Sequence, residues 1–325
     1  MKRRQFITLL VGGAAAGPLI ARAQPRAMPV VGILSPEGPM TGNINGLYAG
    51  LRELGYVEGR NIAFEYRWAN GSHEKLTELA EDLVRLRVDV IVAFVTPASL
   101  AAKRATATIP IVMVGTADPV GIGVIASLSH PGGNVTGTSS IAADTVQKQF
   151  ELVRELIPDA SRFAVISNPG NPAFQTLQIT QAKAAAATLG IELQFHEARA
   201  PDLFPTVFED IARDGNRALV ILIDPLYMIH YQALIEYSVK GRYVATMGFR
   251  PFAEAGGLMS FAPNYADQYK RSAVYVDKIL KGVRPTDSPV EQATKIELVV
   301  NLTTAKKLGV DIPTSILLRA DNLIE

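Results

Sequence analysis

Hydroxyl and carboxylate side chains follow two apolar runs in the first half of the chain, where they could bind an anionic group. Thr96 and Ser99 flank Pro97, a residue type favoured in the first turn of a helix. Thr116 and Asp118 follow the next apolar run. A helix that begins at the end of a strand directs free backbone N–H groups toward that end, and these favour an anion. The same side chains are common helix N-caps, so capping alone and capping combined with ligand contact both stay open.

In the second half of the chain, a carboxylate and two rings have positions that suit the other end of a ligand. Asp224 follows an apolar run, and a buried carboxylate there could pair with a cationic group. Tyr227 and Phe249 could cover an apolar part of the ligand. The alternatives are an N-cap role for Asp224 and ordinary core packing for the two rings.

Signatures of the common cofactor and metal enzymes are missing from the sequence. There is no cysteine, which excludes disulfides, thiolate catalysis and zinc–cysteine sites. Gly121-Ile122-Gly123 lacks the third glycine of a dinucleotide fingerprint, and neither a GxSxG elbow nor a phosphate-binding Walker loop occurs. The histidines do not have metal-ligand spacing and are expected to be surface or hydrogen-bonded residues: His73, His130, His196 and His230. We expect no metal, no cofactor and no enzymatic activity.

The elements that position these side chains alternate between strand and helix from Pro29 onward. Continuous apolar runs separated by helical patterns predict an α/β fold with parallel sheets covered on both faces. Strands are expected at residues 29–36, 61–68, 88–95 and 111–114, and again at 162–168, 191–197, 218–223 and 243–247.

The two halves share a pattern of polar-proline pairs at strand ends, which predicts two similar lobes. Thr96-Pro97 corresponds to Asp224-Pro225, and Ser35-Pro36 corresponds to Asn168-Pro169. We expect the chain to cross between the lobes several times and the lobes to close about a hinge near Thr138 and Ser260. The predicted division is 28–137 with 264–283 for the N-terminal lobe, 138–263 with 298–325 for the C-terminal lobe, and 284–297 for a third crossing.

The first 23 residues resemble an export signal. Lys2, Arg3 and Arg4 precede a short apolar run, and the segment 21–23 (Ala-Arg-Ala) is typical of a cleavage site, so a mature protein beginning near Gln24 is expected. The paired arginines also resemble a twin-arginine (Tat) signal, while a Sec signal stays open. Periplasmic localisation follows from either route.

The charge balance argues against nucleic acid as a partner. The whole chain has a formal net charge of +1. Residues 1–23 hold basic side chains and no acidic ones, so the remainder is slightly acidic and lacks the positive excess that phosphate binding needs. No later apolar run reaches the roughly 20 residues that span a bilayer. A monomer is expected.

Three segments of the sequence resemble a known family. They are LGYVEGRNIAFEYRWANG (54–71), the pattern TIPIV…DPV…PGGNVTG within 108–137, and VVNLTTAKKLGVDIP (299–313). They are similar to the ABC-transporter substrate-binding proteins that include tryptophan- and tyrosine-binding members, and the similarity covers essentially all of the chain after the leader. The resemblance implies a type I periplasmic-binding-protein fold, with two doubly wound parallel-sheet lobes joined by a multi-crossing hinge. By position, it implicates Ser35, Thr96, Thr116, Asn168, Asp224 and Phe249 in ligand binding.

Together these features predict the solute-binding component of an ABC importer, which takes a small carboxylate-bearing solute between its lobes and docks on a permease in the inner membrane. The solute would be an amino acid or an aromatic or aliphatic acid. A sensory protein that docks on a signalling receptor is the alternative, and an enzyme on the same scaffold is a third. A repressor-type regulator of this fold would need a DNA-binding headpiece.

Overall fold

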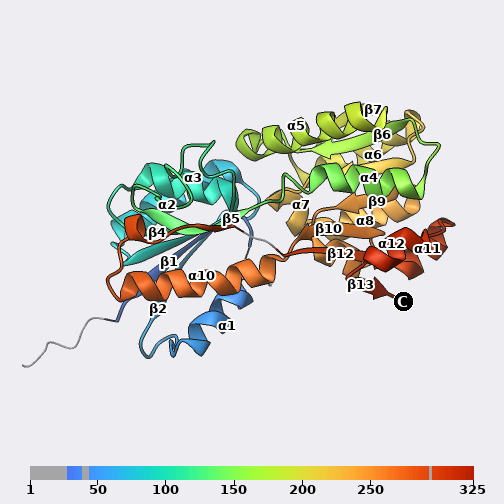
Figure 1. Ribbon diagram of the computed structural model, residues 1–325. Helices are drawn as coiled ribbons and strands as arrows, with labels where there is room; N and C mark the ends of the chain where they lie inside the picture. The colour runs from blue at the N-terminus through green and yellow to red at the C-terminus, as the bar shows by residue number, and fades with distance from the viewer. Residues whose placement is uncertain (1–27, 39–43, 293–294) are drawn as a thin grey trace, which may run out of the picture.

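The computed structural model describes residues 28–38, 44–292 and 295–325. It has two β-sheets, each with helices on both faces, lying end to end (Figure 1). The expected leader at 1–23 lies outside the described residues.

All neighbouring strands of the first sheet are parallel, in the order β11-β5-β4-β3-β1-β2. The strands are β1 (Val30–Ser35), β2 (Ala63–Trp68), β3 (Val90–Phe94), β4 (Ile111–Ala117), β5 (Val135–Ser140) and β11 (Glu291–Gln292). The central strands β3 and β4 are buried along their whole length. Their continuous apolar runs reflect this burial on both faces.

Two pairs of helices cover the first sheet (Figure 1). On one face lie α2 (Leu76–Arg85) and α3 (Val95–Ala105). On the other face lie α1 (Asn45–Glu53) and α10 (Tyr265–Leu280), so a helix from late in the chain completes the sheet formed by the early chain.

The second sheet has the order β13-β12-β10-β9-β8-β6-β7, with an antiparallel pair between β10 and β12. Its strands are β6 (Arg162–Ser167), β7 (Glu192–Glu197), β8 (Ala218–Ile221), β9 (Val244–Met247), β10 (Met259–Pro263), β12 (Ile296–Asn301) and β13 (Asn322–Ile324). One face packs on α4 (Val146–Leu156), α5 (Pro172–Leu189), α11 (Leu302–Leu308) and α12 (Thr314–Arg319). The other packs on α6 (Phe204–Arg213), α7 (Pro225–Ile229), α8 (Tyr231–Lys240) and α9 (Arg250–Glu254).

Strand pairing locates the connections between the two sheets. We call the described residues of 28–140 and 264–292 the first lobe, and those of 141–263 and 295–325 the second lobe. The boundaries expected after residues 137 and 297 fall inside β5 and β12, because both strands stay paired beyond those points. The prediction of an α/β fold with two predominantly parallel, doubly wound sheets is confirmed.

An ionic cluster stands where the chain passes from β10 to α10. Glu297, on β12, accepts hydrogen bonds from Arg250 Nη1 and Asn264 Nδ2, both at 2.9 Å, and lies 2.9 Å from Lys295 Nζ. Asn264 also caps α10 by accepting from the backbone N–H of Asp267. Glu297 therefore links the second sheet to the helix that returns to the first.

The same contacts set the charge of Glu297, which is 7 % exposed. Burial acts to raise its pKa, but the hydrogen bonds from Lys295, Asn264 and Arg250 outweigh burial and hold the pKa below its ordinary value of 4.5. A depressed pKa means that Glu297 stabilises the fold above pH 4.5, and that this contribution is lost as the pH falls through the folded-state pKa.

We predict that Glu297→Gln lowers the free energy of unfolding by about 1–3 kcal/mol near neutral pH, since hydrogen bonds to a charged group weaken. Denaturant unfolding at a series of pH values should show that the difference in unfolding free energy from wild type decreases below pH 4.5. Glu236→Gln, at an exposed glutamate, is the control. A difference in unfolding free energy between Glu297→Gln and wild type that does not depend on pH would contradict the depressed pKa of Glu297.

A second prediction concerns Gly137, in β5 close to the first crossing. Its φ is +128°, and an added Cβ would overlap the backbone of Met113 on β4. Gly137→Ala should destabilise the protein by about 3 kcal/mol or more, through overpacking and backbone strain together. Gly282→Ala is the matched control, with a φ of +94° and no atom within 4 Å of the added Cβ. It should cost only about 1–2 kcal/mol. Equal thermal shifts in both variants would contradict the prediction.

Candidate functional site

Segments that follow strands of the first sheet meet segments that follow strands of the second. His73, beyond β2, lies 3.6 Å from Asp224, beyond β8, measured from Nε2 to Oδ1. An added Cβ at Gly71 would contact Leu226 and Ile229. The two lobes are therefore in contact at the strand ends where the sequence predicts ligand-binding side chains.

The hydroxyl residues of the first lobe join α3 to β4. Ser99 Oγ and Thr116 Oγ1 are 2.6 Å apart, and Ser99 Oγ also lies 3.0 Å from the carbonyl oxygen of Val95. Thr96 Oγ1 accepts from the backbone N–H of Ala117 at 3.0 Å. These hydroxyls are buried, so their bonds fix the N-terminal turn of α3 against the end of β4. Thr96 still has its hydroxyl hydrogen to donate.

Backbone strain coincides with the same strand ends. Val95, the first residue of α3, has a φ of +57°, and Asp118, just beyond β4, has a φ of +40°. A left-handed conformation is a genuine outlier for a β-branched residue such as valine. Strain of this kind persists only where surrounding contacts impose it, and it is concentrated at binding and active sites.

Ser35 and Asp118 stabilise turns at the C-terminal ends of β1 and β4. Ser35 is 3 % exposed, and its Oγ accepts from the backbone N–H of Glu37 at 3.1 Å. Asp118 is exposed, and its Oδ1 accepts from the backbone N–H of Gly121 at 2.9 Å. Glycine is needed at 121 because the carboxylate of Asp118 occupies the space of a Cβ there.

In the second lobe, the fully buried carboxylate of Asp224 accepts three hydrogen bonds. Asn168 Nδ2 donates to Oδ1 at 2.8 Å, Asn171 Nδ2 donates to Oδ2 at 2.9 Å, and the backbone N–H of Leu226 donates to Oδ1 at 3.0 Å. The bond from Leu226 makes Asp224 the N-cap of α7, as one interpretation of the sequence expects. A buried carboxylate is tolerable only with such partners.

Two further residues at this edge were not identified from the sequence. Asn171 is the last residue before α5, and only its place between two prolines indicates a structural role. His73 is 12 % exposed at its side chain, and its ring nitrogens are buried without a hydrogen bond to any described residue. His73 was expected at the surface or hydrogen-bonded, and the structure instead places its ring beside Asp224 of the other lobe, at the start of the short 3-10 helix His73–Lys75.

Tyr227 and Phe249 lie within the second lobe. The Tyr227 hydroxyl donates to the carbonyl of Ala198 at 2.8 Å, and its ring lies 6.1 Å from that of Phe204. Burial, with Asp224 nearby, raises the Tyr227 pKa well above its ordinary value. Phe249 is 2 % exposed and packs edge-to-face on Tyr231 at 5.6 Å. Both rings have the packing contacts of core residues.

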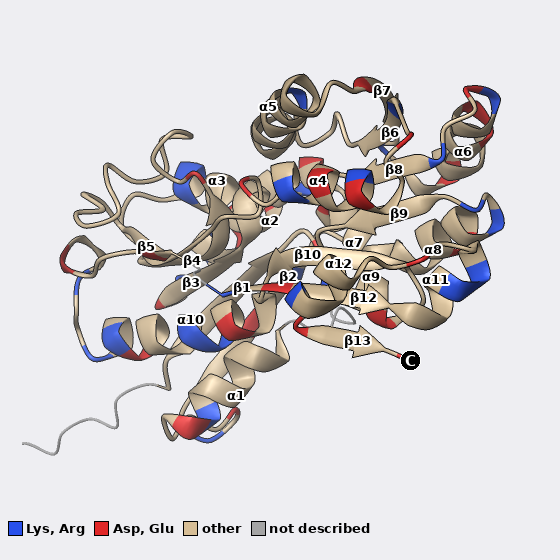
Figure 2. Ribbon diagram, turned by 45° about the vertical axis from the view of Figure 1, so that its right-hand side comes forward, with Lys and Arg blue, Asp and Glu red and all other residues tan. Residues whose placement is uncertain are grey.

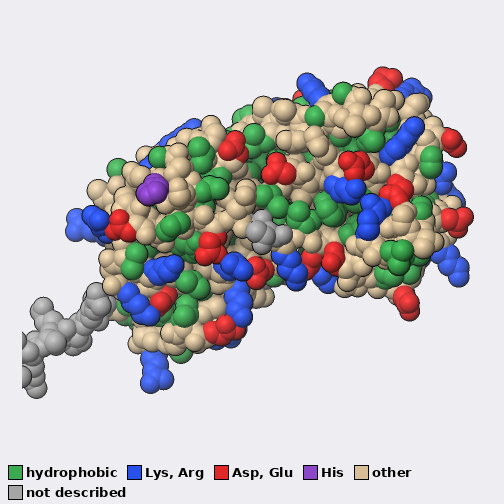
Figure 3. Space-filling view, in the orientation of Figure 1, with side chains coloured by type: hydrophobic (Ala, Val, Ile, Leu, Met, Phe, Trp, Pro, Cys, Tyr) green, Lys and Arg blue, Asp and Glu red, His purple; other side chains and the backbone are tan. Residues whose placement is uncertain are grey.

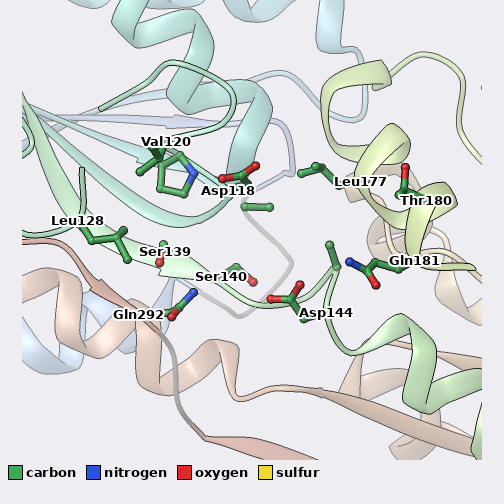
Figure 4. A pocket seen from close by; sticks show the side chains of 13 residues that line it. Asp118, Val120, Leu128, Ser139, Ser140, Asp144, Leu177, Thr180, Gln181 and Gln292 are labelled. Carbon is green, nitrogen blue, oxygen red and sulfur yellow. The ribbon is translucent and has the colours of Figure 1, made fainter. Parts of the chain in front are cut away.

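Two cavities between the lobes flank these strand ends. One of about 370 Å³ lies beyond β2, and its lining includes His73, Asn168, Arg199 and His230. Burial lowers the His230 pKa. The other, of about 310 Å³, lies beyond β4 and β5 and is lined by Asp118 among others (Figure 4). Strands β3 and β1, with Thr96 and Ser35 at their ends, lie between the two cavities.

The outer surface carries mixed charge. Basic and acidic side chains alternate along the helices in Figure 2, and they are interspersed on the face seen in Figure 3. Within the described residues, no helix is long and apolar enough to cross a membrane, and no three His, Cys, Asp or Glu side chains form a group that could hold a metal ion.

Comparison with known proteins gives a consistent set of relatives. Residues 29–324 match the family model described as ABC transporter substrate binding protein. A tyrosine-binding protein of Clostridioides difficile (strain R20291) is 27 % identical over 290 residues, which cover 86 % of this chain and 78 % of the relative.

Two solved structures share the whole architecture. A conserved domain protein from Vibrio cholerae has a TM-score of 0.84 at 30 % identity, covering 91 % of this chain and 99 % of that one. An ABC domain from Streptococcus pneumoniae in complex with L-Trp has a TM-score of 0.81 at 25 % identity, with the same coverage. The predicted type I periplasmic-binding-protein fold is confirmed, and the chain belongs to the family of ABC transporter substrate-binding proteins.

Proposed function

We propose that this protein is the exported solute receptor of an ABC importer, and that it closes its lobes on a small carboxylate-bearing solute, an amino acid. The observation that carries this is the buried Asp224, which is held by amides of its own lobe and faces His73 of the other. A polar group buried between lobes is a natural sensor of closure, because its surroundings differ between the open and closed states.

The relatives support an amino acid as the solute. One is a tyrosine-binding protein, and another was solved with L-Trp. In this chain, the solute carboxylate would lie at the N-terminal turn of α3, near Thr96, where free N–H groups favour an anion.

The solute ammonium would lie against Asp224. A carboxylate offers about four acceptor positions, of which the N–H groups of Asn168, Asn171 and Leu226 take three. The remaining position is on Oδ2, which among the described residues accepts only from Asn171, and an ammonium group would bind there. His73, beside Oδ1, would move to admit it. Ser35, Ser99, Thr116 and Asn168 would act by holding these strand ends in place.

Delivery to a membrane permease and periplasmic localisation complete the proposal. Both are supported by membership of the family and by the leader pattern at 1–23. Mass spectrometry of ligand that copurifies with the mature protein would identify the natural solute directly.

We predict that L-tyrosine or L-tryptophan, whichever binds, reduces the radius of gyration in solution scattering. A ligand that touches both lobes favours the closed state through its additional contacts there. The scattering calculated from the present structure should fit the ligand-bound data better than the ligand-free data. An unchanged radius at saturation would rule out closure.

We also predict that Asp224→Asn weakens binding of an amino acid by roughly 2–5 kcal/mol in calorimetry, because it removes one partner of a buried charge pair. It should barely affect the desamino acid, which lacks the ammonium. Comparing L-tyrosine with 3-(4-hydroxyphenyl)propionate therefore separates lost pairing from general damage to the site.

Thr96→Val should weaken both compounds by roughly 1–3 kcal/mol, through the loss of one buried hydrogen-bonding group. Thr188→Val is the matched control, since Thr188 is exposed on α5 and bonds only within that helix. If both Thr96→Val and Asp224→Asn leave affinity unchanged, the binding site is not at these strand ends.

A further inference from the structure

The cavity beyond β4 and β5 has features that the proposed amino-acid site does not use. Its volume is about 310 Å³, and both lobes contribute to its lining. From the first lobe come the loop after β4, the end of β5 and Gln292, and from the second come Asp144 and one side of α5 (Figure 4). Closure of the lobes therefore completes this cavity.

The charge of the lining is of one sign. Asp118 stands on one side and Asp144 on another, and no Lys, Arg or His is among the described residues that line the cavity. The cavity at the other end of the cleft differs, because Arg199, His73 and His230 line it. A cation is therefore favoured at the Asp118 end of the cleft.

Two polar groups of the lining lack partners of their own. Ser139 is 1 % exposed, and its hydroxyl has no hydrogen-bond partner in the described part of the chain. A buried hydroxyl without a partner is costly, which points to a ligand or water that occupies the cavity. The Asp144 carboxylate, which is exposed at the cavity mouth, makes no hydrogen bond or ion pair with the side chains of the described residues.

The remaining lining suits an apolar stem. Val120, Leu128 and Leu177 contribute aliphatic surface, and Gln181 and Gln292 add amides that can accept hydrogen bonds (Figure 4). An ammonium group on a carbon chain or ring would bury its stem against the aliphatic side chains and direct its three donors to the oxygens.

We propose that this cavity binds an ammonium group carried by the solute, with Asp118 and Asp144 as the anionic partners and Ser139 as a further acceptor. The inference rests on the proposed solute-binding function and narrows the solute class to compounds with an amine that reaches this end of the cleft. The amine is a second one, on the solute side chain, because the α-ammonium is placed at Asp224.

Asp118 has two roles that a variant can separate. It contributes a negative charge to the cavity, and it stabilises its own turn. Its Oδ1 accepts from the backbone N–H of Gly121, and its backbone is left-handed. Asparagine keeps an oxygen for that bond and tolerates the left-handed conformation, so Asp118→Asn removes the charge and preserves the turn. Asp144→Asn removes the other charge. Asp159→Asn, at an exposed site beyond α4, is the control.

The experiment measures three ligands by calorimetry on the mature full chain. In the series 3-phenylpropionate, L-phenylalanine and 4-aminomethyl-L-phenylalanine, each member adds one ammonium group to the last. We expect the second addition, which places an ammonium group on the side chain, to increase affinity in the wild type. That increase should fall by roughly threefold to tenfold in Asp118→Asn and in Asp144→Asn, and stay unchanged in Asp159→Asn. The first addition supplies the α-ammonium, and its effect on affinity should not change in either aspartate variant.

Equal affinities of L-phenylalanine and 4-aminomethyl-L-phenylalanine would overturn the inference, as would an increment that both aspartate variants leave intact, or the failure of all three ligands to bind. The proposed function is judged separately. If L-phenylalanine binds and closes the lobes as well as 4-aminomethyl-L-phenylalanine does, solute binding stands and the second ammonium site does not. Unaltered melting temperatures for Asp118→Asn and Asp144→Asn would confirm that the changes report on the ligand.

Discussion

The burial of the Asp224 carboxylate is the constraint on which the cleft edge of the second lobe depends. A charge removed from water is stable only when its acceptor positions are filled. That requirement explains why two asparagines stand in the turn between β6 and α5, and why α7 begins where its first free N–H group meets the same carboxylate. His73 extends the arrangement to the other lobe. Removing a member of this set leaves a buried polar group unsatisfied, so the position of one loop depends on the others.

The fold could be predicted from the sequence because its signals are local. Apolar runs such as ALVILI at 218–223 are continuous rather than alternating, and this pattern indicates a parallel sheet covered on both faces. The site was harder to predict. Thr96, Thr116 and Asp224 could be placed at the cleft from the sequence because strand ends gather at one edge of a sheet, but their contact with a ligand stays a prediction. His73 was missed because its contact with Asp224 joins distant segments, and no sequence spacing records such a contact. The division into lobes was approximate for a similar reason, since β5 and β12 continue past the expected boundaries through pairing with their neighbours.

The connections between the lobes are tied to the site at several points. Thr138, next to Ser139 in β5, accepts a hydrogen bond at Oγ1 from the backbone N–H of Gly115 in β4. On the other side, Glu297 joins β12 to the cap of α10, whose Tyr269 stacks on Phe94 at 4.5 Å, immediately before α3. The end of β3 that leads into α3 therefore packs on the helix that the ionic cluster anchors. A change in the ionic cluster would therefore affect the proposed ligand-binding end of β3 through the side chains that pack between them.

The order of the chain has a consequence for how the protein reaches its folded state. Helix α10 covers the first sheet, and β12 and β13 complete the second, so both lobes need residues from 264 onward. As the polypeptide leaves the ribosome from its N-terminus, neither sheet can cover its apolar face until that segment has emerged. Contacts between distant segments are slow to form, and sheets left incomplete expose apolar surface and unpaired edges that promote aggregation. Nascent chains shorter than this would expose apolar surface of the kind that chaperones bind, and truncation at residue 264 would damage both lobes at once.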